Sequence, residues 1–347
     1  LNVLDLIQQA KLTPEMRDLL VMKDQELRAR SMDSLLDVGG ESLAQGLEES
    51  LTDEAFATEV REILSLDSYR QVIGEHMDRV VREKENDVGR MEAAKMLGMM
   101  EATPEVVRRL KQLLQDSSPE VLNYALASAA VHRKRDFLPL IIGHLGNPST
   151  QAVAQDALAV YGGRVVGTLQ QRLKEERLDP EVHRAIPEVL SRIGTQKAAD
   201  VLVGMLAGGR AEARAETIDA LFKLRSSHAG IVFPPGQVRR AVLRLFGDAY
   251  AVVLDKGKQG ARPRLTILLK QIFDLLSLIH PYEDIARAYQ NISLGTKKAV
   301  DYSLELLDNL LDPQLKAFIF PLVEDLPEDQ CLAQVRRLDR ILKRARP

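Results

Sequence analysis

Basic side chains gather between residues 239 and 264, and they are the residues of this chain best suited to hold an anion. Guanidinium and ammonium groups bind phosphates and carboxylates through charge-assisted hydrogen bonds. The candidate anion- or partner-binding patch consists of Arg239, Arg240, Arg244, Lys256, Lys258, Arg262 and Arg264. Its ligand would be a lipid head group, a nucleotide or a nucleic acid. A solvated loop beside ordinary charged helix faces explains the same residues, and the pattern favours that interpretation.

The glycine-rich loop inside this stretch is not a nucleotide-binding loop of the Walker type. Residues 255–262 read Asp-Lys-Gly-Lys-Gln-Gly-Ala-Arg, which lacks the GxxxxGK[ST] order. The loop also does not follow a predicted strand, as such a phosphate cradle requires.

The six histidines are scattered, and no pair of them has metal-ligand spacing. Neither an HExxH nor a CxxC motif is present. The string His280-Pro-Tyr-Glu283-Asp284 gathers donor atoms, but it stands where one predicted helix ends and another begins. Carboxylates at that position favour helix capping over metal binding. We therefore predict no metal site.

Nucleophilic catalysis has no support in the sequence. A GxSxG motif is absent, and Cys331 is the only cysteine, in a charged stretch without a nearby histidine. We expect an inert thiol, and a single cysteine also excludes an intramolecular disulfide framework. The acidic groups around Glu83, Glu85 and Asp87 resemble a solvated turn. The sequence therefore predicts a protein that is not an enzyme and needs no cofactor.

The last predicted helix, residues 331–344, is amphipathic and basic. Its apolar positions are Leu332, Val335, Leu338, Ile341 and Leu342, and its basic positions are Arg336, Arg337, Arg340, Lys343 and Arg344. Such a helix can lie on an anionic membrane or dock a partner. The alternative, which we favour, is a helix that caps the end of a repeat array.

Composition limits the function classes further. The chain has 347 residues, 45% of them hydrophobic and 28% charged, which excludes wholesale disorder. A formal net charge of −3 gives no global attraction to nucleic acid or anionic lipid. The absence of Trp and the 4% aromatic content argue against base-stacking and sugar-binding platforms. No stretch reaches the roughly 20 apolar residues of a membrane span. Because the chain starts on Leu1, we expect it to be part of a longer protein.

An internal repeat determines how these residues are arranged. Four helix ends close on a small residue at a spacing of 32, namely Gly98, Ala130, Gly162 and Gly194. Paired apolar positions precede each of them at the same spacing, and a fifth copy at 219–224 follows one residue out of step. We expect the closing residues to supply the positive φ of a helix C-terminus. A period in this range indicates a stack of helical hairpins.

Each repeat contains a second, shorter amphipathic helix, and turn signals separate the copies. We predict second helices over 106–114, 137–145, 166–173 and 198–206. The clusters Ser118-Pro-Glu, Asn147-Pro-Ser-Thr150 and Asp179-Pro-Glu are helix starts, because Ser, Thr or Asp caps and Pro fits the first turn. Longer helices are expected over 237–254 and 264–279.

The repeats over residues 85–225 resemble the HEAT-repeat family of α-solenoids. The likeness rests on the Ser-Pro-Glu-Val and Asp-Pro-Glu-Val openings at 118–121 and 179–182, on the Ala-Leu pairs and on the closing glycines. Pro187 inside a first helix also fits. Weaker copies occupy 27–52 and 54–82. The resemblance implies an all-α fold, a right-handed α-solenoid of HEAT-like hairpins, with a regular array over 1–230 and less regular repeats over 231–347.

A narrower resemblance covers residues 210–325. The strings at 239–250 and 303–311 are similar to the soluble HEAT-like region of bacterial membrane proteins, where it follows a transporter domain similar to ATP/ADP translocases. This likeness implies the soluble cytoplasmic part of a membrane protein, tethered to the inner face of the cytoplasmic membrane. A transporter domain in cis would then be a partner.

Together these features predict a non-enzymatic scaffold that binds a protein partner on the concave face lined by the second helices. The alternative is a HEAT-like nucleic-acid-binding protein or enzyme with a basic concave groove. We do not expect nucleic acid as the partner, because the charges of the second helices are mixed and Trp is absent. Peripheral membrane contact through residues 332–346 stays open.

Overall fold

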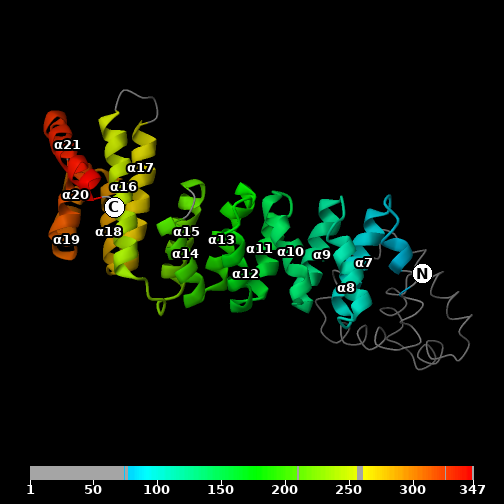
Figure 1. Cartoon of the computed structure of the whole chain (residues 1–347). Helices are drawn as coiled ribbons and strands as arrows, with labels where there is room; N and C mark the ends of the chain where they lie inside the picture. Colours follow the sequence, from blue (N-terminus) through cyan, green and yellow to red (C-terminus); the bar gives the residue numbers. More distant parts are fainter. Residues whose placement is uncertain (1–73, 75–76, 209–210, 256–260, 325, 346–347) are drawn as a thin grey trace, which may run out of the picture. The chain divides into compact units, whose positions relative to one another are not determined.

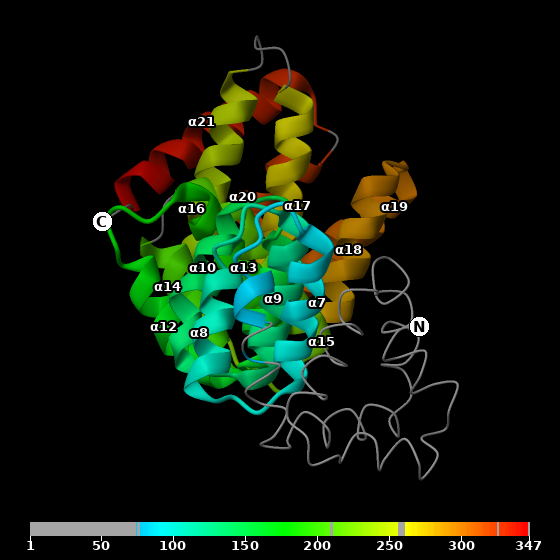
Figure 2. The ribbon, with the colours of Figure 1, turned by 90° about the vertical axis from the view of Figure 1, so that its right-hand side faces the viewer.

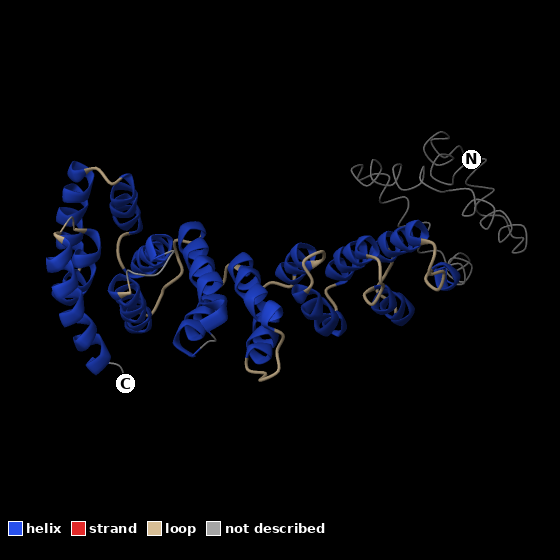
Figure 3. Cartoon of the chain, turned by 90° about the horizontal axis from the view of Figure 1, so that it is seen from above, coloured by secondary structure: helices blue, strands red, loops and turns tan. Residues whose placement is uncertain are grey.

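The fold was analysed in a computed structural model, which describes residues 74, 77–208, 211–255, 261–324 and 326–345. Within these residues the chain consists of helices joined by short loops, and none of them lies in a strand (Figure 3). The predicted all-α fold is therefore confirmed. The weaker repeat copy predicted over 27–52 lies outside the described residues, and of the copy predicted over 54–82 the structure describes only residues 74 and 77–82.

The chain divides into two compact units, Leu1–Tyr161 and Gly162–Pro347. The described helices of the first unit are α7 (Asp87–Met99), α8 (Pro104–Leu113), α9 (Pro119–His132), η1 (Arg135–Phe137), α10 (Leu138–Gly143), η2 (His144–Gly146) and α11 (Gln151–Val160). Within this unit α9 packs between α7 and α11, and α8 covers α7 and α9. Figure 1 labels these elements.

The second unit contains longer helices towards its C-terminal end. Its helices are α12 (Gly163–Leu173), α13 (Pro180–Ile193), α14 (Gln196–Gly208), η3 (Ala211–Ala213), α15 (Arg214–Ser227), α16 (Pro235–Leu254), α17 (Ala261–Ile279), α18 (Tyr282–Leu294), α19 (Lys297–Leu310), α20 (Pro313–Val323) and α21 (Glu328–Ala345). α16 has 20 residues and α15 has 14, and the predicted boundary at residue 231, which differs from the division into units at Tyr161, stays a prediction.

The helices of the second unit form two layers. In one layer α12, α14, α16 and α21 contact each other in that order, and in the other α13, α15, α17 and α18 do so. Figure 2 shows α14, α16 and α21 on one side of this unit and α15, α18 and α19 on the other. The last helix thus packs against α16, although more than 70 residues separate the two in sequence.

Local sequence explains where the helices begin. Thr103 and Asp179 accept backbone N–H bonds at the starts of α8 and α13, and Asp312 does the same for α20. Ser118 precedes α9 as predicted, but its hydroxyl donates to Glu120 rather than capping the helix. Proline at the first turn fits each of these four helices because that position needs no N–H donor.

The closing small residues serve two different purposes. Gly162 and Gly194 have positive φ values of 59° and 66°, as the pattern predicts. Gly98 instead lies inside α7, and α9 runs past Ala130 to end at Arg133, which itself adopts the left-handed conformation with φ of 50°. The prediction of positive φ is therefore wrong at Gly98 and Ala130. Gly98 lies so close to Ser128 of α9 that a side chain would clash, and Ala130 is buried.

Candidate functional site

Arg239 of the predicted basic patch is engaged inside the protein. Its guanidinium forms an ion pair with Asp312, the residue that caps α20, and donates a hydrogen bond of 2.9 Å to Gln314 Oε1. Arg239 in turn holds the pKa of Asp312 at about 2, below its usual value. This contact ties the start of α16 to the start of α20, so its first role is structural.

The other arginines of α16 differ from each other. Arg244 donates to the carbonyl oxygens of Leu206 and Ala207, at 3.0 and 3.2 Å, and so satisfies the C-terminal end of α14. Arg240 is exposed and forms no ion pair with a residue that the structure describes. Only Arg240 of these three is available to an external anion.

The remaining members of the patch lie at the opposite end of α16. Arg262 and Arg264 are exposed in the first turn of α17, and Lys256 and Lys258 lie outside the described residues. Arg240 and the end of α16 at Leu254 are about 20 Å apart at 1.5 Å per helical residue. The structure therefore separates Arg239, Arg240 and Arg244 from Arg262 and Arg264, and a single site formed by all seven residues stays a prediction.

A cleft of about 450 Å³ lies between the ends of α16 and α17. Its polar lining consists of Asp248, Asp255, Arg264 and Gln271, and its apolar lining of Ala251, Val252, Ala261, Ile267 and Leu268. Asp248 also pairs with Arg214 of α15 at 2.7 Å. The C-terminal end of α16 and the N-terminal end of α17, which line the cleft, extend beyond α14 and α15 (Figure 1), since α16 and α17 have 20 and 19 residues and α14 and α15 have 13 and 14.

The mixture of polar and apolar residues that line the cleft does not indicate a particular reaction or ligand. The cleft holds two carboxylates and one guanidinium, but its lining contains no serine, cysteine or histidine that could act as a nucleophile or general base. No cluster of three or more metal-ligating side chains occurs in the described part of the chain. The expected lack of a metal, a cofactor and an enzymatic activity stays a prediction.

His280 lies beside the Arg239–Asp312 ion pair rather than in a metal site. Burial and the nearby Arg239 lower the pKa of His280, against the influence of Asp312. Its buried Nε2 has no hydrogen-bond partner among the residues described. Glu283 and Asp284 occupy the first turn of α18, where carboxylates interact favourably with the helix dipole, but the N-cap residue is Pro281 and no side chain caps this helix.

Cys331 is a half-buried free thiol at the start of α21. Its Sγ lies 3.3 Å from the carbonyl oxygen of Pro321, to which the thiol donates. The expectation of an inert thiol stays a prediction.

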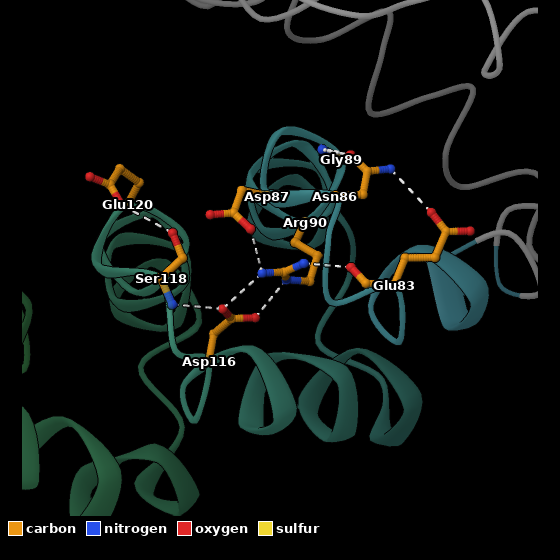
Figure 4. A network of polar contacts seen from close by, with 8 residues as sticks. All are labelled: Glu83, Asn86, Asp87, Gly89, Arg90, Asp116, Ser118 and Glu120. Carbon is orange, nitrogen blue, oxygen red and sulfur yellow. Dashed lines mark hydrogen bonds and ion pairs between the residues drawn. The ribbon is translucent and has the colours of Figure 1, made fainter.

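A cluster of polar contacts surrounds the buried Arg90 in the first unit (Figure 4). The guanidinium donates to both oxygens of Asp116, at 2.7 and 3.1 Å, to Asp87 at 2.8 Å and to the carbonyl oxygen of Glu83. Arg90 is 2% exposed, and Asp116 also accepts the backbone N–H of Ser118. The cluster joins the first turn of α7 to the turn between α8 and α9, so the turn at 83–87 is more than a solvated loop.

Side chains that bond the main chain of a neighbouring hairpin recur along both units. In the first unit, Ser128 donates to the carbonyl oxygen of Ala94, and the Nε2–H groups of His132 and His144 donate to those of Leu97 and Leu114, each at 2.7 Å. In the second unit, Tyr250 donates to the carbonyl oxygen of Phe318 at 2.6 Å. From the sequence, only the repeat period indicated that side chains of successive hairpins would meet, and it did not identify these residues.

Helix α21 uses its apolar face for packing. Val335 and Leu342 are 0% and 4% exposed, whereas Ile341 is 44% exposed and the arginines at 336, 337, 340 and 344 face solvent. The helix contacts α16 and α20. Val335 and Leu342 are therefore covered by the protein itself, Leu332 and Leu338 are half-buried, and peripheral membrane contact stays a prediction.

The fold thus defines an all-helical protein of packed helical hairpins. Compared with protein-family models and with curated proteins, the chain matches none. Among the residues described, no helix is both long enough and apolar enough to cross a membrane.

Proposed function

We propose that the chain is a non-enzymatic scaffold for protein interactions, built as a right-handed solenoid of HEAT-like hairpins. The observation that carries the proposal is the packing of the second unit. There each of α12, α14 and α16 packs on the next helix of the same layer, and the last of them packs on α21. Helices that are stabilised by their neighbours leave one face of every hairpin to solvent, and such faces add up to an extended binding surface.

The distribution of polar groups supports the same function. The polar contacts of the buried Arg90 and Tyr250 and of the half-buried Arg239 each connect a helix to another helix or to the turn beside it, and each is satisfied within the protein. Side chains in these positions stabilise the stack. We therefore place partner binding on the exposed faces of the helices.

Crosslinking with mass spectrometry tests the scaffold. The folded chain, immobilised and exposed to an extract of its source cells, is expected to retain a specific protein that is crosslinked to lysines on outward helix faces, such as Lys197 or Lys297. Excess untagged chain should displace this partner. Retention that persists after heat unfolding of the immobilised chain, or turnover of a small-molecule substrate by the pure protein, would contradict the proposal.

We also propose that the chain works at the cytoplasmic face of a bacterial membrane as the soluble part of a nucleotide transporter-like protein. The strings at 239–250 and 303–311, which carry this likeness, fall in α16 and α19. The full-length gene product is expected to contain hydrophobic spans that precede Leu1. A full-length product without such spans would rule this part of the proposal out.

A nucleic-acid-binding protein is the second candidate, because four arginines of α21 face solvent without a carboxylate partner in the described residues. Binding of duplex DNA at low salt, with the steep salt dependence of phosphate contacts, would favour this candidate over the scaffold.

A further inference from the structure

One layer of the second unit presents cations that form no ion pair with any residue that the structure describes. We name this surface the basic layer, and its residues are Arg164 of α12, Lys197 of α14, Arg240 of α16, and Arg336, Arg337, Arg340 and Arg344 of α21. All seven side chains belong to exposed residues. The acidic residues of the same four helices are Asp200, which accepts a hydrogen bond from Gln196, Asp248, which pairs with Arg214, Asp339, which pairs with Lys343, and Glu328 and Asp329 in the first turn of α21.

The other layer of this unit differs because most of its cations are neutralised. Lys223 of α15 bridges Glu188 and Asp219, at 2.9 and 2.8 Å, and Arg192 binds Glu188 at 2.9 Å. Lys270 of α17 pairs with the buried Asp274 at 2.7 Å. Ion pairs therefore neutralise these cations of α13, α15 and α17, although Arg262 and Arg264 of α17 stay exposed, whereas the seven cations of the basic layer have no such partner among the described residues.

The cations of the basic layer lie on adjoining helix faces. The Nζ atom of Lys197 lies 3.7 Å from the position that a Cβ on Gly167 of α12 would occupy, which places the exposed stripes of α12 and α14 side by side. Arg244 reaches from α16 to the carbonyl oxygens at the end of α14. Helix α21 then packs directly on α16.

Helix α21 concentrates the charge. Arg336, Arg340 and Arg344 recur at every fourth residue and so share one face, and Arg337 lies beside them. Lys343 is not part of this set, because it pairs with Asp339 at 2.6 Å. The 44% exposed Ile341 borders the arginines and adds an apolar contact.

We propose that the basic layer is the docking site for an acidic protein segment, one that carries several aspartates or glutamates and an apolar side chain placed against Ile341. This inference rests on the proposed scaffold function and specifies the chemistry of its partner. Arginine is enriched at protein interfaces and binds carboxylates through two parallel hydrogen bonds. Complementary charge supplies specificity and a fast encounter.

Two other anionic partners fit the layer less well. A membrane-bound helix buries its apolar face in lipid, but Val335 and Leu342 are already buried in the protein. Single-stranded nucleic acid needs exposed aromatic rings for stacking, whereas α12, α14 and α21 contain no aromatic residue and Phe246 and Tyr250 of α16 are fully buried.

At Gly204 of α14 an added Cβ would meet no atom, so a peptide main chain can approach closely there.

Fluorescence anisotropy with the full chain tests the proposal. The probe is a labelled 20-residue peptide in which glutamates alternate with leucine and alanine, and its control replaces every glutamate by glutamine. The test variant is R337Q/R340Q, and the matched control is K297Q/K298Q, which removes two exposed cations from α19, a helix outside the basic layer. We expect the chain to bind the acidic probe only, about five- to tenfold more weakly in R337Q/R340Q, and with unchanged affinity in K297Q/K298Q.

Additional measurements distinguish an acidic protein segment from DNA or a lipid surface as the partner. A photo-crosslinking version of the probe should label α14, α16 or α21. Equal weakening by the two double variants would overturn the proposal, because binding would then depend on net charge alone. Binding to duplex DNA or to phosphatidylserine vesicles without binding to the acidic peptide would overturn it as well. If a partner captured from cells crosslinks elsewhere on the chain, the scaffold function stands and this inference fails.

Discussion

At the residue scale, buried polar groups hold neighbouring hairpins together. Arg90 is the clearest case, since its guanidinium satisfies both oxygens of Asp116, one of Asp87 and a main-chain carbonyl while it is 2% exposed. A charge in such a position is tolerated only when every donor finds an acceptor. The cluster therefore determines the geometry of the turn that it closes.

Replacing Arg90 by methionine is expected to lower the free energy of unfolding by about 3 to 5 kcal/mol, because the buried Asp116 carboxylate would lose its cation. Urea denaturation followed by circular dichroism measures the change. Arg108→Met is the control, since Arg108 pairs with Asp78 on the surface with 53% of its side chain exposed, and its loss should cost less than about 1 kcal/mol. Similar effects of both substitutions would contradict the structural role of the Arg90 cluster.

Glu92 provides a prediction about pH. Burial raises its pKa from 4.5 to about 7, although Lys95 opposes the shift, and its Oε1 is buried without a partner among the described residues. Because the pKa is higher in the folded than in the unfolded state, folding binds a proton between pH 4.5 and 7, and stability falls as the pH rises through this window. The charged form above pH 7 is therefore the destabilising one.

Glu92→Gln should raise the stability at pH 8 by on the order of 1 to 3 kcal/mol and leave it nearly unchanged at pH 4. Urea midpoints of the two proteins across this pH range measure the effect. A stability difference that does not vary with pH would show that Glu92 is ionised at its ordinary pKa.

At the element scale, helix spacing depends on which small residue lies where two helices cross. A Cβ placed on Gly98 of α7 would lie 2.6 Å from Ser128 Oγ and 3.2 Å from the Cα atom of Ser128 in α9. The repeat pattern identified Gly98 correctly as special, but it assigned the wrong reason. Only the packed helices show that contact with a neighbour, and not a left-handed conformation, requires the glycine.

Gly98→Ala is expected to destabilise the first unit by about 1 to 3 kcal/mol, because the extra methyl group overpacks the α7–α9 contact. Thermal or urea unfolding gives the value. Gly143→Ala in α10 is the control, since an added Cβ there meets no atom within 4 Å and alanine favours a helix. The substitution Ser128→Gly should restore part of the stability lost in Gly98→Ala, and its failure to do so would place the clash elsewhere.

Helix boundaries could be predicted well from capping residues and periodicity. The expected second helices over 106–114 and 198–206 correspond to α8 and α14 within a few residues. The segment 137–145 differs, because the structure divides it into η1, α10 and η2. Pro139 at the first turn of α10 and the glycines at 143 and 146 weaken a continuous α-helix there.

At the scale of the molecule, the contacts between successive hairpins predict local rather than global responses. In the second unit the Tyr250–Phe318 hydrogen bond and the Arg239–Asp312 ion pair hold α20 against α16 over sequence separations of 68 and 73 residues. Stacks of this kind transmit a perturbation mainly to the nearest neighbours.

Tyr250→Phe should therefore increase hydrogen exchange in α16, α20 and α21, where the lost bond to a buried carbonyl costs about 1 kcal/mol. Exchange in α7 and α9 of the first unit should not change. Hydrogen–deuterium exchange with mass spectrometry measures both regions in one experiment. Uniformly faster exchange along the chain would contradict this local behaviour and indicate a single cooperative unit.

The sequence by itself determined the helical class, the repeat period and most helix starts, because these depend on local residue patterns that act within one or two turns. It also located the cations of 239–264 and of the last helix. Which cations remain available was decided only by the tertiary structure, since Arg239 and Arg244 find their partners in α20 and α14, far away in sequence. The same holds for α21, whose packing on α16 turns its apolar side inward and its arginines outward. Long-range pairing depends on which helices become neighbours, and periodicity alone carries no information about that.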